Sequence, residues 1–313
     1  MSGEPQNSVV DLRPALAASA RKRQAGPQIA YSIGGITVGL FGPPDMHLKL
    51  DRQLVPFCAS PAALDVHIEV DWSDHLAKPS HAPTFHSGGL WSLYEETDGH
   101  RFFFSTPFLG AAPYKSAWFD RDFRRGHVTL FRRYFDARRS PNVLEYPLDE
   151  LLAIHRLSRG EGVEVHAVGV VDESNRGHLL LGHSGAGKST SARLWQKRPG
   201  VRVLSDDRII LRFDRGHARM YGTPWHGDAG LALADSADLA GMYILQHGCR
   251  NELTLLPAGR AAAELFARSF VPYHCQEGLK FTLRFLENLT RSVSCSLFQF
   301  VPDQTAVETI CHA

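Results

Sequence analysis

The chain has 313 residues, of which 43% are hydrophobic and 21% are charged, and its formal net charge is +1. This composition is ordinary for a soluble globular protein, the near-zero charge argues against a dominant attraction to nucleic acid or to a membrane, and no apolar run reaches the ~18 residues of a membrane span. The length predicts two domains, or one large domain with an extension.

Residues 1–27 are polar and rich in Pro, Ala and Arg, which predicts a flexible tail. The N-terminus lacks a basic region followed by an apolar core, so it does not resemble a secretory signal. The cysteines are scattered and form no C-x-x-C pair, so we expect neither a zinc site nor a disulfide framework, and a cytoplasmic location follows. They are Cys58, Cys249, Cys275, Cys295 and Cys311.

Residues 28–145 are predicted to form a β-rich N-terminal domain. Short apolar or alternating runs separated by turns are typical of an antiparallel sheet. The clearest of these runs are Ile36–Phe41, Leu64–Val70, Phe102–Ser105 and His127–Phe131.

The stretch Arg121–Arg139 is rich in arginine and interleaved with aromatic residues. It could be a binding face for an acidic or phosphorylated partner, or the solvated face of a β-hairpin whose aromatic side chains enter the core. Charge runs are usually solvated surface, which favours the second interpretation.

Residues 146–313 are predicted to form an α/β nucleotide-binding domain. The apolar positions of Pro147–Leu157 have helical spacing, with proline at the start. Two apolar strands follow, over Val163–Val171 and His178–Leu181. The second strand leads into a glycine-rich loop at 182–189, and a helix is expected over Thr190–Lys197.

The glycine-rich loop reads Gly-His-Ser-Gly-Ala-Gly-Lys-Ser and matches the phosphate-binding pattern G-x4-G-K-[ST]. Its glycines let backbone N–H groups converge on one anion, its lysine places a positive charge beside the β- and γ-phosphates, and its serine hydroxyl is a natural Mg²⁺ ligand. A strand before the loop and a helix after it provide the context that the motif requires. The residues expected to contact the nucleotide are Gly182, His183, Ser184, Gly185, Ala186, Gly187, Lys188, Ser189 and Thr190.

Two adjacent carboxylates, Asp206 and Asp207, follow the next expected strand, Val201–Leu204, and precede another, Ile209–Leu211. Neighbouring positions in a strand face opposite sides, so the two can differ in role: one holding Mg²⁺, the other accepting a proton from an attacking hydroxyl. The alternative is a simple Asp-Asp turn between strands. Their place after a phosphate loop favours the functional interpretation.

Two further features stay open on physical grounds. The segment Tyr221–Asp228 combines Gly-Pro turn residues with Trp225 and His226, and is either a loop near the transferred phosphoryl group or a rigid turn. His166, alone within an apolar strand, is more often a core histidine than a catalyst.

The order of His166, the loop at 182–189 and Leu204-Ser-Asp-Asp-Arg208 resembles the catalytic domain of HPr kinase/phosphorylase and its wider group, the phosphoenolpyruvate carboxykinase-like kinases. The resemblance covers about residues 146–313 and implies a phosphoenolpyruvate carboxykinase-like P-loop kinase domain, preceded here by a smaller β-rich domain. By position, it implies that Lys188 and the loop bind the phosphates, Ser189 and Asp207 hold Mg²⁺, Asp206 is the acceptor base, and His166 lies near the reacting phosphate. The two aspartates could exchange roles.

The chain also departs from the family pattern. HPr kinases usually carry Asp and Glu where this loop has His183 and Thr190, and their R-G-x-G-I segment is replaced by Tyr221–Gly227. No match to their P-G-R-N segment is present. The chain therefore looks like an HPr-kinase-related subfamily rather than a true HPr kinase, and HPr is not the expected acceptor.

The expected function is ATP- and Mg²⁺-dependent transfer of the γ-phosphoryl group to a hydroxyl, most simply a serine of a peptide, a protein or a small molecule. The expected partners are a nucleoside triphosphate and that acceptor, with no nucleic acid and no membrane; a homo-oligomer stays open. The alternative is a nucleotide-binding regulatory or assembly protein without transferase activity.

Overall fold

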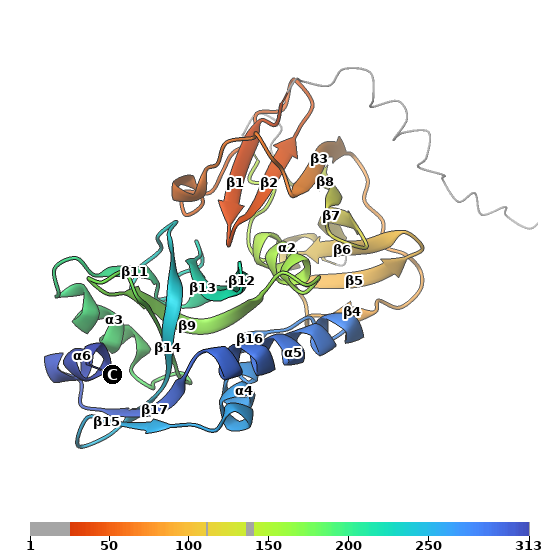
Figure 1. Cartoon of the computed structure of the whole chain (residues 1–313). Helices are drawn as coiled ribbons and strands as arrows, with labels where there is room; N and C mark the ends of the chain where they lie inside the picture. The colour runs from red at the N-terminus through yellow and green to blue at the C-terminus, as the bar shows by residue number, and fades with distance from the viewer. Residues whose placement is uncertain (1–25, 111, 136–140, 313) are drawn as a thin grey trace, which may run out of the picture.

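The computed structural model describes residues 26–110, 112–135 and 141–312, which form a mixed α/β protein with two β-sheets (Figure 1). The expected tail at 1–27 lies almost entirely outside the described residues. The first sheet has the strand order β1-β2-β3-β8-β7-β6-β5-β4. Its strands are β1 (Ile29–Ile33), β2 (Ile36–Phe41), β3 (Val66–Ser73), β4 (Phe85–His86), β5 (Trp91–Glu96), β6 (Gly99–Ser105), β7 (Pro113–Asp120) and β8 (Arg125–Phe131).

The expected strands are present, but the expectation of a purely antiparallel sheet is wrong. β2 pairs with β3 and β3 pairs with β8 in parallel. A long connection after Phe41 brings the chain back beside β2 in the same direction. The antiparallel strands β5 to β8 then return the chain to the free side of β3.

The described part of the arginine-rich stretch is a turn and a strand of this sheet. Arg121, Arg124 and Arg125 are exposed around the turn between β7 and β8, while Phe123 is fully buried within it. Residues 136–140 lie outside the described residues. A solvated turn with an aromatic anchor agrees with the second of the two interpretations.

The second sheet has the order β10-β9-β12-β13-β14-β17-β15, and β14 also pairs with β10, so that β10, β9, β12, β13 and β14 close on one another. β11 and β16 flank β9. The strands are β9 (Val163–Val171), β10 (Gly177–Leu181), β11 (Arg202–Ser205), β12 (Arg208–Asp214), β13 (His217–Gly222), β14 (Ser236–His247), β15 (Glu252–Leu255), β16 (Ser269–Phe270) and β17 (Cys295–Phe300).

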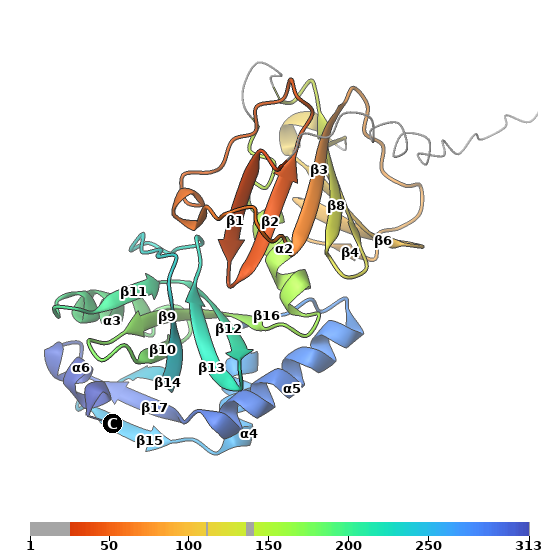
Figure 2. The ribbon, with the colours of Figure 1, turned by 45° about the horizontal axis from the view of Figure 1, so that its top comes forward.

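Helices cover this second sheet at two places. In Figure 2, α3 (Lys188–Gln196) and α6 (Gln304–Cys311) lie at one end, and α4 (Ala258–Phe266) and α5 (Gln276–Ser292) at the other. The buried side chains of α3 and α6 form one core with β10 and β17, and those of α4 and α5 form another with β9 and β14. No helix of the described residues is long and apolar enough to cross a membrane.

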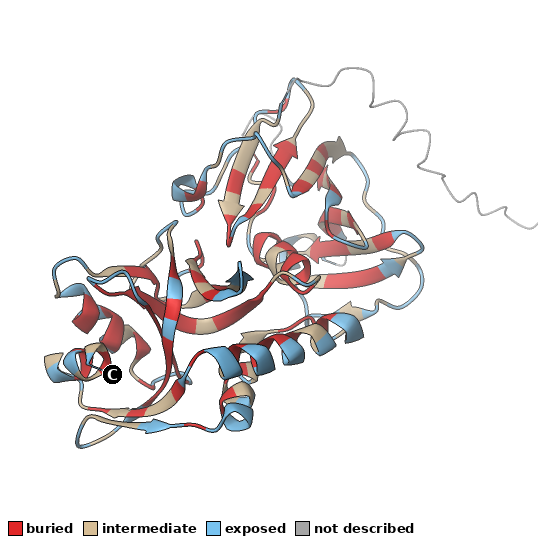
Figure 3. Ribbon diagram, viewed as in Figure 1, coloured by how far each residue is buried: buried red, intermediate tan, exposed pale blue. Residues whose placement is uncertain are grey.

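Helix α2 (Leu148–Leu157) joins the two sheets. In both views it lies between them, and Figure 3 shows that most of it is buried. Leu148, Leu152 and Leu157 share one apolar core with the first sheet, and Ile210 and Trp225 of the second unit enter the same core. Thus the second unit begins near residue 146 in the sequence, but α2 packs against the first sheet. The apolar core that both units share holds them together.

Candidate functional site

The glycine-rich loop connects β10 to α3, as its sequence context predicts. β10 is entirely buried between β9 and β14, which fixes the point where the loop begins. Gly185 and Gly187 have φ values of +81° and +98°, a backbone region that side chains other than glycine rarely adopt. A Cβ on Gly187 would also lie 2.5 Å from the Phe300 ring, so this turn requires glycine twice over.

The N-terminus of α3 is open to a ligand. Gly187 is its N-cap residue and no side chain of the described residues caps it, so the first-turn N–H groups point out of the helix unopposed. The Ser189 hydroxyl makes no hydrogen bond within the described residues. Unpaired N–H groups together with the helix dipole favour an anion at this point.

Lys188 folds back over the loop. Its Nζ donates to the carbonyl oxygens of Gly182 at 2.8 Å and His183 at 3.2 Å. Burial lowers the pKa of Lys188, and nearby Arg268 and Arg208 lower it further while Asp207 opposes them. The lysine is held at the base of the loop with an acidic side chain nearby.

Sequence reasoning missed His247, at the end of β14. Its Nε2 lies 3.0 Å from the Gly185 carbonyl oxygen, and its ring stacks on Phe300 with centroids 5.7 Å apart. His247 and Phe300 both pack against the loop. They are neighbours because β14 pairs in parallel with β17, which the sequence does not reveal.

Strand register explains how His166 reaches the site. β12 pairs with β9 so that Arg208 lies opposite His166, and β16 pairs on the other side of β9 with Phe270 opposite Glu164. Positions i and i+2 of a strand share a face, as do directly opposed residues. His166, Glu164, Arg208 and Phe270 therefore face the same side, and the Arg208 guanidinium lies 4.2 Å above the Phe270 ring.

Asp207 closes this arrangement. His166 Nε2 lies 2.8 Å from Asp207 Oδ1, and Arg208 Nη1 contacts Asp207 Oδ2. Burial tends to raise the pKa of Asp207, but the hydrogen bond from His166 and the charges of Arg208 and Lys188 outweigh it, so the pKa lies below its ordinary value. Asp207 is thus an ionised carboxylate held between a histidine and two cations.

Asp206 has different surroundings. It is only 3% exposed, and its two oxygens accept hydrogen bonds from three backbone N–H groups. Oδ1 accepts from Gly227 at 3.0 Å and Leu231 at 3.2 Å, and Oδ2 accepts from Ala229 at 2.9 Å. Asp206 organises the loop after β13 and is almost fully buried, whereas the Asp207 side chain is 24% exposed, so the base role that the resemblance implied for Asp206 does not suit this geometry.

The segment Tyr221–Asp228 combines features of both earlier interpretations. Trp225 is 7% exposed and packs as a rigid core residue, and its carbonyl oxygen accepts a hydrogen bond from the buried Ser205 hydroxyl. His226 is exposed beside the aspartate pair. A Cβ on Gly227 would lie 3.1 Å from Asp206 Oδ2, so a larger residue here would press on the Asp206 carboxylate.

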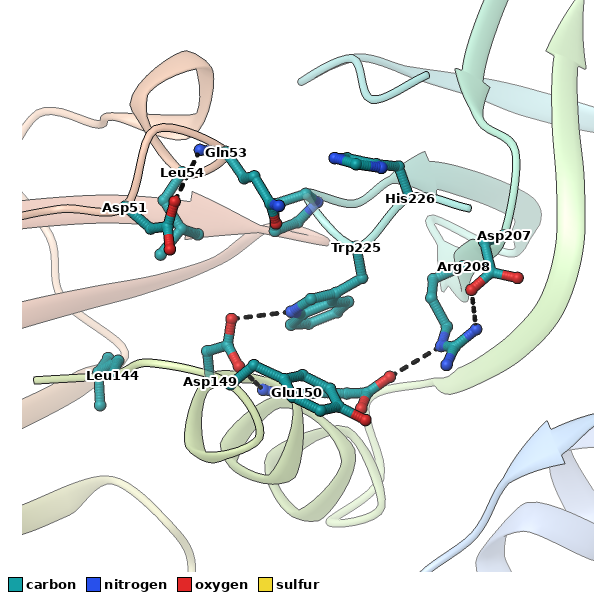
Figure 4. Close-up of a pocket in the computed structure, with 12 residues that line it drawn as sticks. Asp51, Gln53, Leu54, Leu144, Asp149, Glu150, Asp207, Arg208, Trp225 and His226 are labelled. Carbon is teal, nitrogen blue, oxygen red and sulfur yellow. Dashed lines mark hydrogen bonds and ion pairs between the residues drawn. The ribbon is translucent and has the colours of Figure 1, made fainter. Parts of the chain in front are cut away.

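A cavity of about 290 Å³ opens beside Asp207 (Figure 4). Trp225 stands between Asp149, which accepts a hydrogen bond from its Nε1 at 2.8 Å, and Arg208. Glu150 accepts from Arg208 Nε at 2.8 Å. Both β units contribute, and the lining residues are Asp51, Gln53, Leu54, Leu144, Tyr146, Asp149, Glu150, Asp207, Arg208, Pro224, Trp225 and His226.

Two buried carboxyl groups near this cavity have raised pKa values. Burial raises the pKa of Asp149 to about 6, although its hydrogen bond from Trp225 opposes the change. Burial raises the pKa of Glu164 well above its ordinary value, and the neighbouring Glu150 adds to this while Arg208 opposes it. Both oxygens of Glu164 are buried and make no hydrogen bond within the described residues, although Arg208 Nε lies 3.6 Å from Oε1. Sequence reasoning did not single out Glu164. The signal that could have found it is a charged residue within the apolar run of β9.

The described residues contain no group of three or more His, Cys, Asp or Glu side chains that could hold a metal ion. All five cysteines are free, and Cys58 and Cys249 are exposed. A Mg²⁺ ion at this site would therefore depend on the Ser189 hydroxyl, one carboxylate and the phosphates of a bound nucleotide, which is the usual mode for this ion in nucleotide enzymes.

No protein-family model matches the chain, and no curated protein matches it. Among solved structures, the HPr(Ser) kinase/phosphatase from Coxiella burnetii is similar over 48% of this chain and 93% of its own, with 14% identity and a TM-score of 0.28. At that TM-score the structural likeness says nothing about the reaction. A functional proposal must therefore rest on the geometry of the site.

Proposed function

We propose that the protein is an ATP- and Mg²⁺-dependent kinase that transfers the γ-phosphoryl group to a hydroxyl. The observation that carries the proposal is the His166–Asp207 pair, 2.8 Å apart, beside the glycine loop and its lysine. A binding module needs only the loop and the open end of α3. An ionised carboxylate held by a histidine next to them adds a group that can orient a nucleophile.

In this proposal the loop amides and Lys188 bind the triphosphate. Lys188 exchanges its present bonds to the Gly182 and His183 carbonyls for phosphate oxygens. The Ser189 hydroxyl would hold Mg²⁺, which supplies neutralisation of the phosphate charge when bound. The N–H groups of the loop, the Lys188 charge and the N-terminus of α3 are all electropositive, and together they hold the triphosphate in one orientation.

Asp207 orients the acceptor hydroxyl. The hydroxyl oxygen forms a bond to the γ-phosphorus, the bond from that phosphorus to the bridging oxygen breaks, and ADP leaves. The hydroxyl proton passes to the Asp207 carboxylate. Because its pKa is low, Asp207 is a weak base, which suits a transfer in which the proton leaves late and positioning provides most of the catalysis.

The base role thus passes from Asp206 to Asp207, which is one half of the exchange that the sequence left open; Asp206 takes no metal role, because three backbone N–H groups hold its carboxylate. His166 acts through Asp207 as a positioning residue.

If Asp207 instead binds Mg²⁺, replacing it would raise the Mg²⁺ concentration needed for half-maximal rate. If it orients the hydroxyl, that concentration would stay the same while the rate falls.

The test is transfer of label from γ-labelled ATP by the full-length protein, with Lys188→Ala as the inactive variant and Lys280→Ala, an exposed lysine on α5, as the matched control. Lys188→Ala should lose turnover and weaken ATP binding, and Lys280→Ala should behave like the wild type. Full ATP affinity and full activity in Lys188→Ala would refute the site. Tight ATP binding without transfer to any hydroxyl would favour the regulatory alternative.

A further inference from the structure

The cavity beside Asp207 belongs to neither β unit alone. Asp51, Gln53 and Leu54 come from the segment before the short 3-10 turn Val55–Phe57 of the first unit. Trp225 and His226 come from the loop after β13 of the second. A volume of about 290 Å³ is enough for a small molecule or the end of a peptide.

This cavity shares a wall with the proposed reaction centre. Asp207 lines it and also contacts His166, and the Lys188 charge is near enough to lower the pKa of Asp207. A compound in the cavity can therefore place a hydroxyl at Asp207 without crossing the phosphate loop. The nucleotide and the cavity occupant would approach Asp207 from different elements, α3 and the interface between the β units.

The charges on the walls restrict what can bind. The carboxylates of Asp51, Asp149, Glu150 and Asp207 line the cavity, and among the described lining residues Arg208 is the only lysine or arginine. Arg208 is already bound by Glu150 at 2.8 Å and contacts Asp207. An anionic occupant would meet these carboxylates with no unpaired guanidinium to compensate, whereas a cation would be attracted.

The walls also provide a place for the cation. Asp51 is exposed at the rim, where its oxygens accept from the Gln53 N–H at 3.3 Å and the Asn142 side chain at 3.4 Å. Tyr146 and Trp225 add aromatic faces, which favour ammonium groups. Carboxylate and aromatic groups together are the usual surroundings of a bound amine.

We propose that this cavity binds the acceptor, and that the acceptor is a hydroxyl compound with an ammonium group a few bonds from the hydroxyl. The inference rests on the proposed kinase function and adds the substrate class. The ammonium group stays protonated beside the wall carboxylates, the hydroxyl oxygen is phosphorylated at the Asp207 end, and the hydroxyl proton is lost through Asp207. Free amino alcohols and the N-terminal serine of a peptide share this chemistry.

The experiment compares matched acceptors with full-length protein, ATP and Mg²⁺, measuring ADP formation and phosphorylated product by mass spectrometry. One arm uses ethanolamine, N-acetylethanolamine and glycolate. The other uses a short peptide with an N-terminal serine, with and without N-terminal acetylation. We expect the amine of at least one arm to exceed its acetylated partner about tenfold in kcat/KM, because one ionic contact is removed, and we expect no turnover of glycolate. The arm in which the amine is preferred shows whether the acceptor is a free amino alcohol or the N-terminal serine of a peptide.

Asp51→Asn tests the cavity itself, since Asp51 lies outside the proposed nucleotide site. It should raise the KM for the amine about fivefold, as expected for loss of one exposed charge, while leaving ATP affinity unchanged. Asp45→Asn, an exposed aspartate of the same unit that does not line the cavity, is the matched control and should change neither. Equal KM values in the two variants would overturn the assignment.

The two proposals fail in different ways. If the wild type binds ATP and hydrolyses it slowly through Lys188, yet accepts the acetylated or carboxylate compounds as well as the amines, the acceptor inference is wrong and the kinase proposal stands. The same holds if that hydrolysis occurs and no amine is phosphorylated. If ATP does not bind, both proposals are wrong.

Discussion

The indole N–H of Trp225 donates a hydrogen bond to the Asp149 carboxylate at 2.8 Å, and this bond links the loop that carries the aspartate pair to helix α2 of the other unit. Both side chains are buried. The apolar core of the first sheet includes Trp225 as well, so the second unit is held to the first sheet by a shared core and a buried polar contact. The cavity beside Asp207 owes its shape to this junction.

Asp149→Asn should stabilise the protein at neutral pH. The amide oxygen can still accept from Trp225 and the buried charge disappears, but the amide nitrogen cannot accept from the Glu150 N–H, which now donates to Asp149 Oδ1 at 2.8 Å. Because burial raises the pKa of Asp149 to about 6, the folded state holds the proton more tightly than the unfolded state, so the wild type loses stability as the pH rises from about 4 to 6. The gain from the lost charge exceeds the cost of one hydrogen bond, so denaturant unfolding should show a net gain of roughly 1–2 kcal/mol for the variant above pH 6.

The control for that measurement is Trp225→Phe, which keeps the ring and removes the donor. It should lower the free energy of unfolding by about 1–3 kcal/mol, because a buried carboxylate loses a partner. If Asp149→Asn were as destabilising as Trp225→Phe, the hydrogen bond would need the charge, and the buried carboxylate would be stabilising the fold.

Asp206→Asn and Asp207→Asn should fail differently. Asn at 206 cannot satisfy Gly227, Leu231 and Ala229 together, because one carboxylate oxygen becomes an N–H donor. We expect a loss of about 1–3 kcal/mol in the free energy of unfolding. Asp207→Asn should lose less stability than Asp206→Asn, because its side chain is partly exposed, and should keep its ATP affinity but lower kcat by about 10²–10⁴-fold, the usual contribution of a general base.

Measuring unfolding and kinetics on both variants separates these roles. A stable Asp206→Asn protein that binds ATP normally and has lost turnover would return the base role to Asp206. His166→Gln should lower kcat less than Asp207→Asn, since the histidine acts through Asp207.

A histidine pair between the units should make the fold sensitive to acid. His155 Nε2 lies 2.9 Å from His274 Nε2. Burial lowers the pKa of His155 to about 3, and of His274 to about 4. The unfolded chain binds these protons near the ordinary value of 6.5, so stability is complete above that pH and falls as the pH drops toward 4, by up to about 1.4 kcal/mol per pH unit for each proton.

His155→Gln should flatten this pH dependence when the melting temperature is followed between about pH 4 and 7. His217→Gln, at an exposed position at the start of β13, is the control and should leave the slope unchanged. An identical slope in the wild type and His155→Gln would assign the acid sensitivity to other groups.

Local sequence patterns predicted the elements that depend on near neighbours. The apolar run at Val163–Val171, the helical spacing of Pro147–Leu157 and the glycine loop all correspond to elements with nearly the same bounds. These signals are local because backbone conformation and burial periodicity act over a few residues. The parallel pairs of the first sheet could not be read in this way, since strand direction depends on how long connections cross the sheet.

By itself, the sequence determined that a strand, a glycine-rich loop and a helix follow one another, because glycine adopts the φ values of Gly185 and Gly187 far more readily than other residues do. It also singled out two adjacent aspartates but could not divide their roles. Tertiary structure gives them different surroundings: the β9–β12 register brings Asp207 to His166, and three backbone N–H groups of the loop after β13 donate to Asp206. The cavity, too, exists only because residues near 51 and near 225, far apart in the chain, are buried against a shared core.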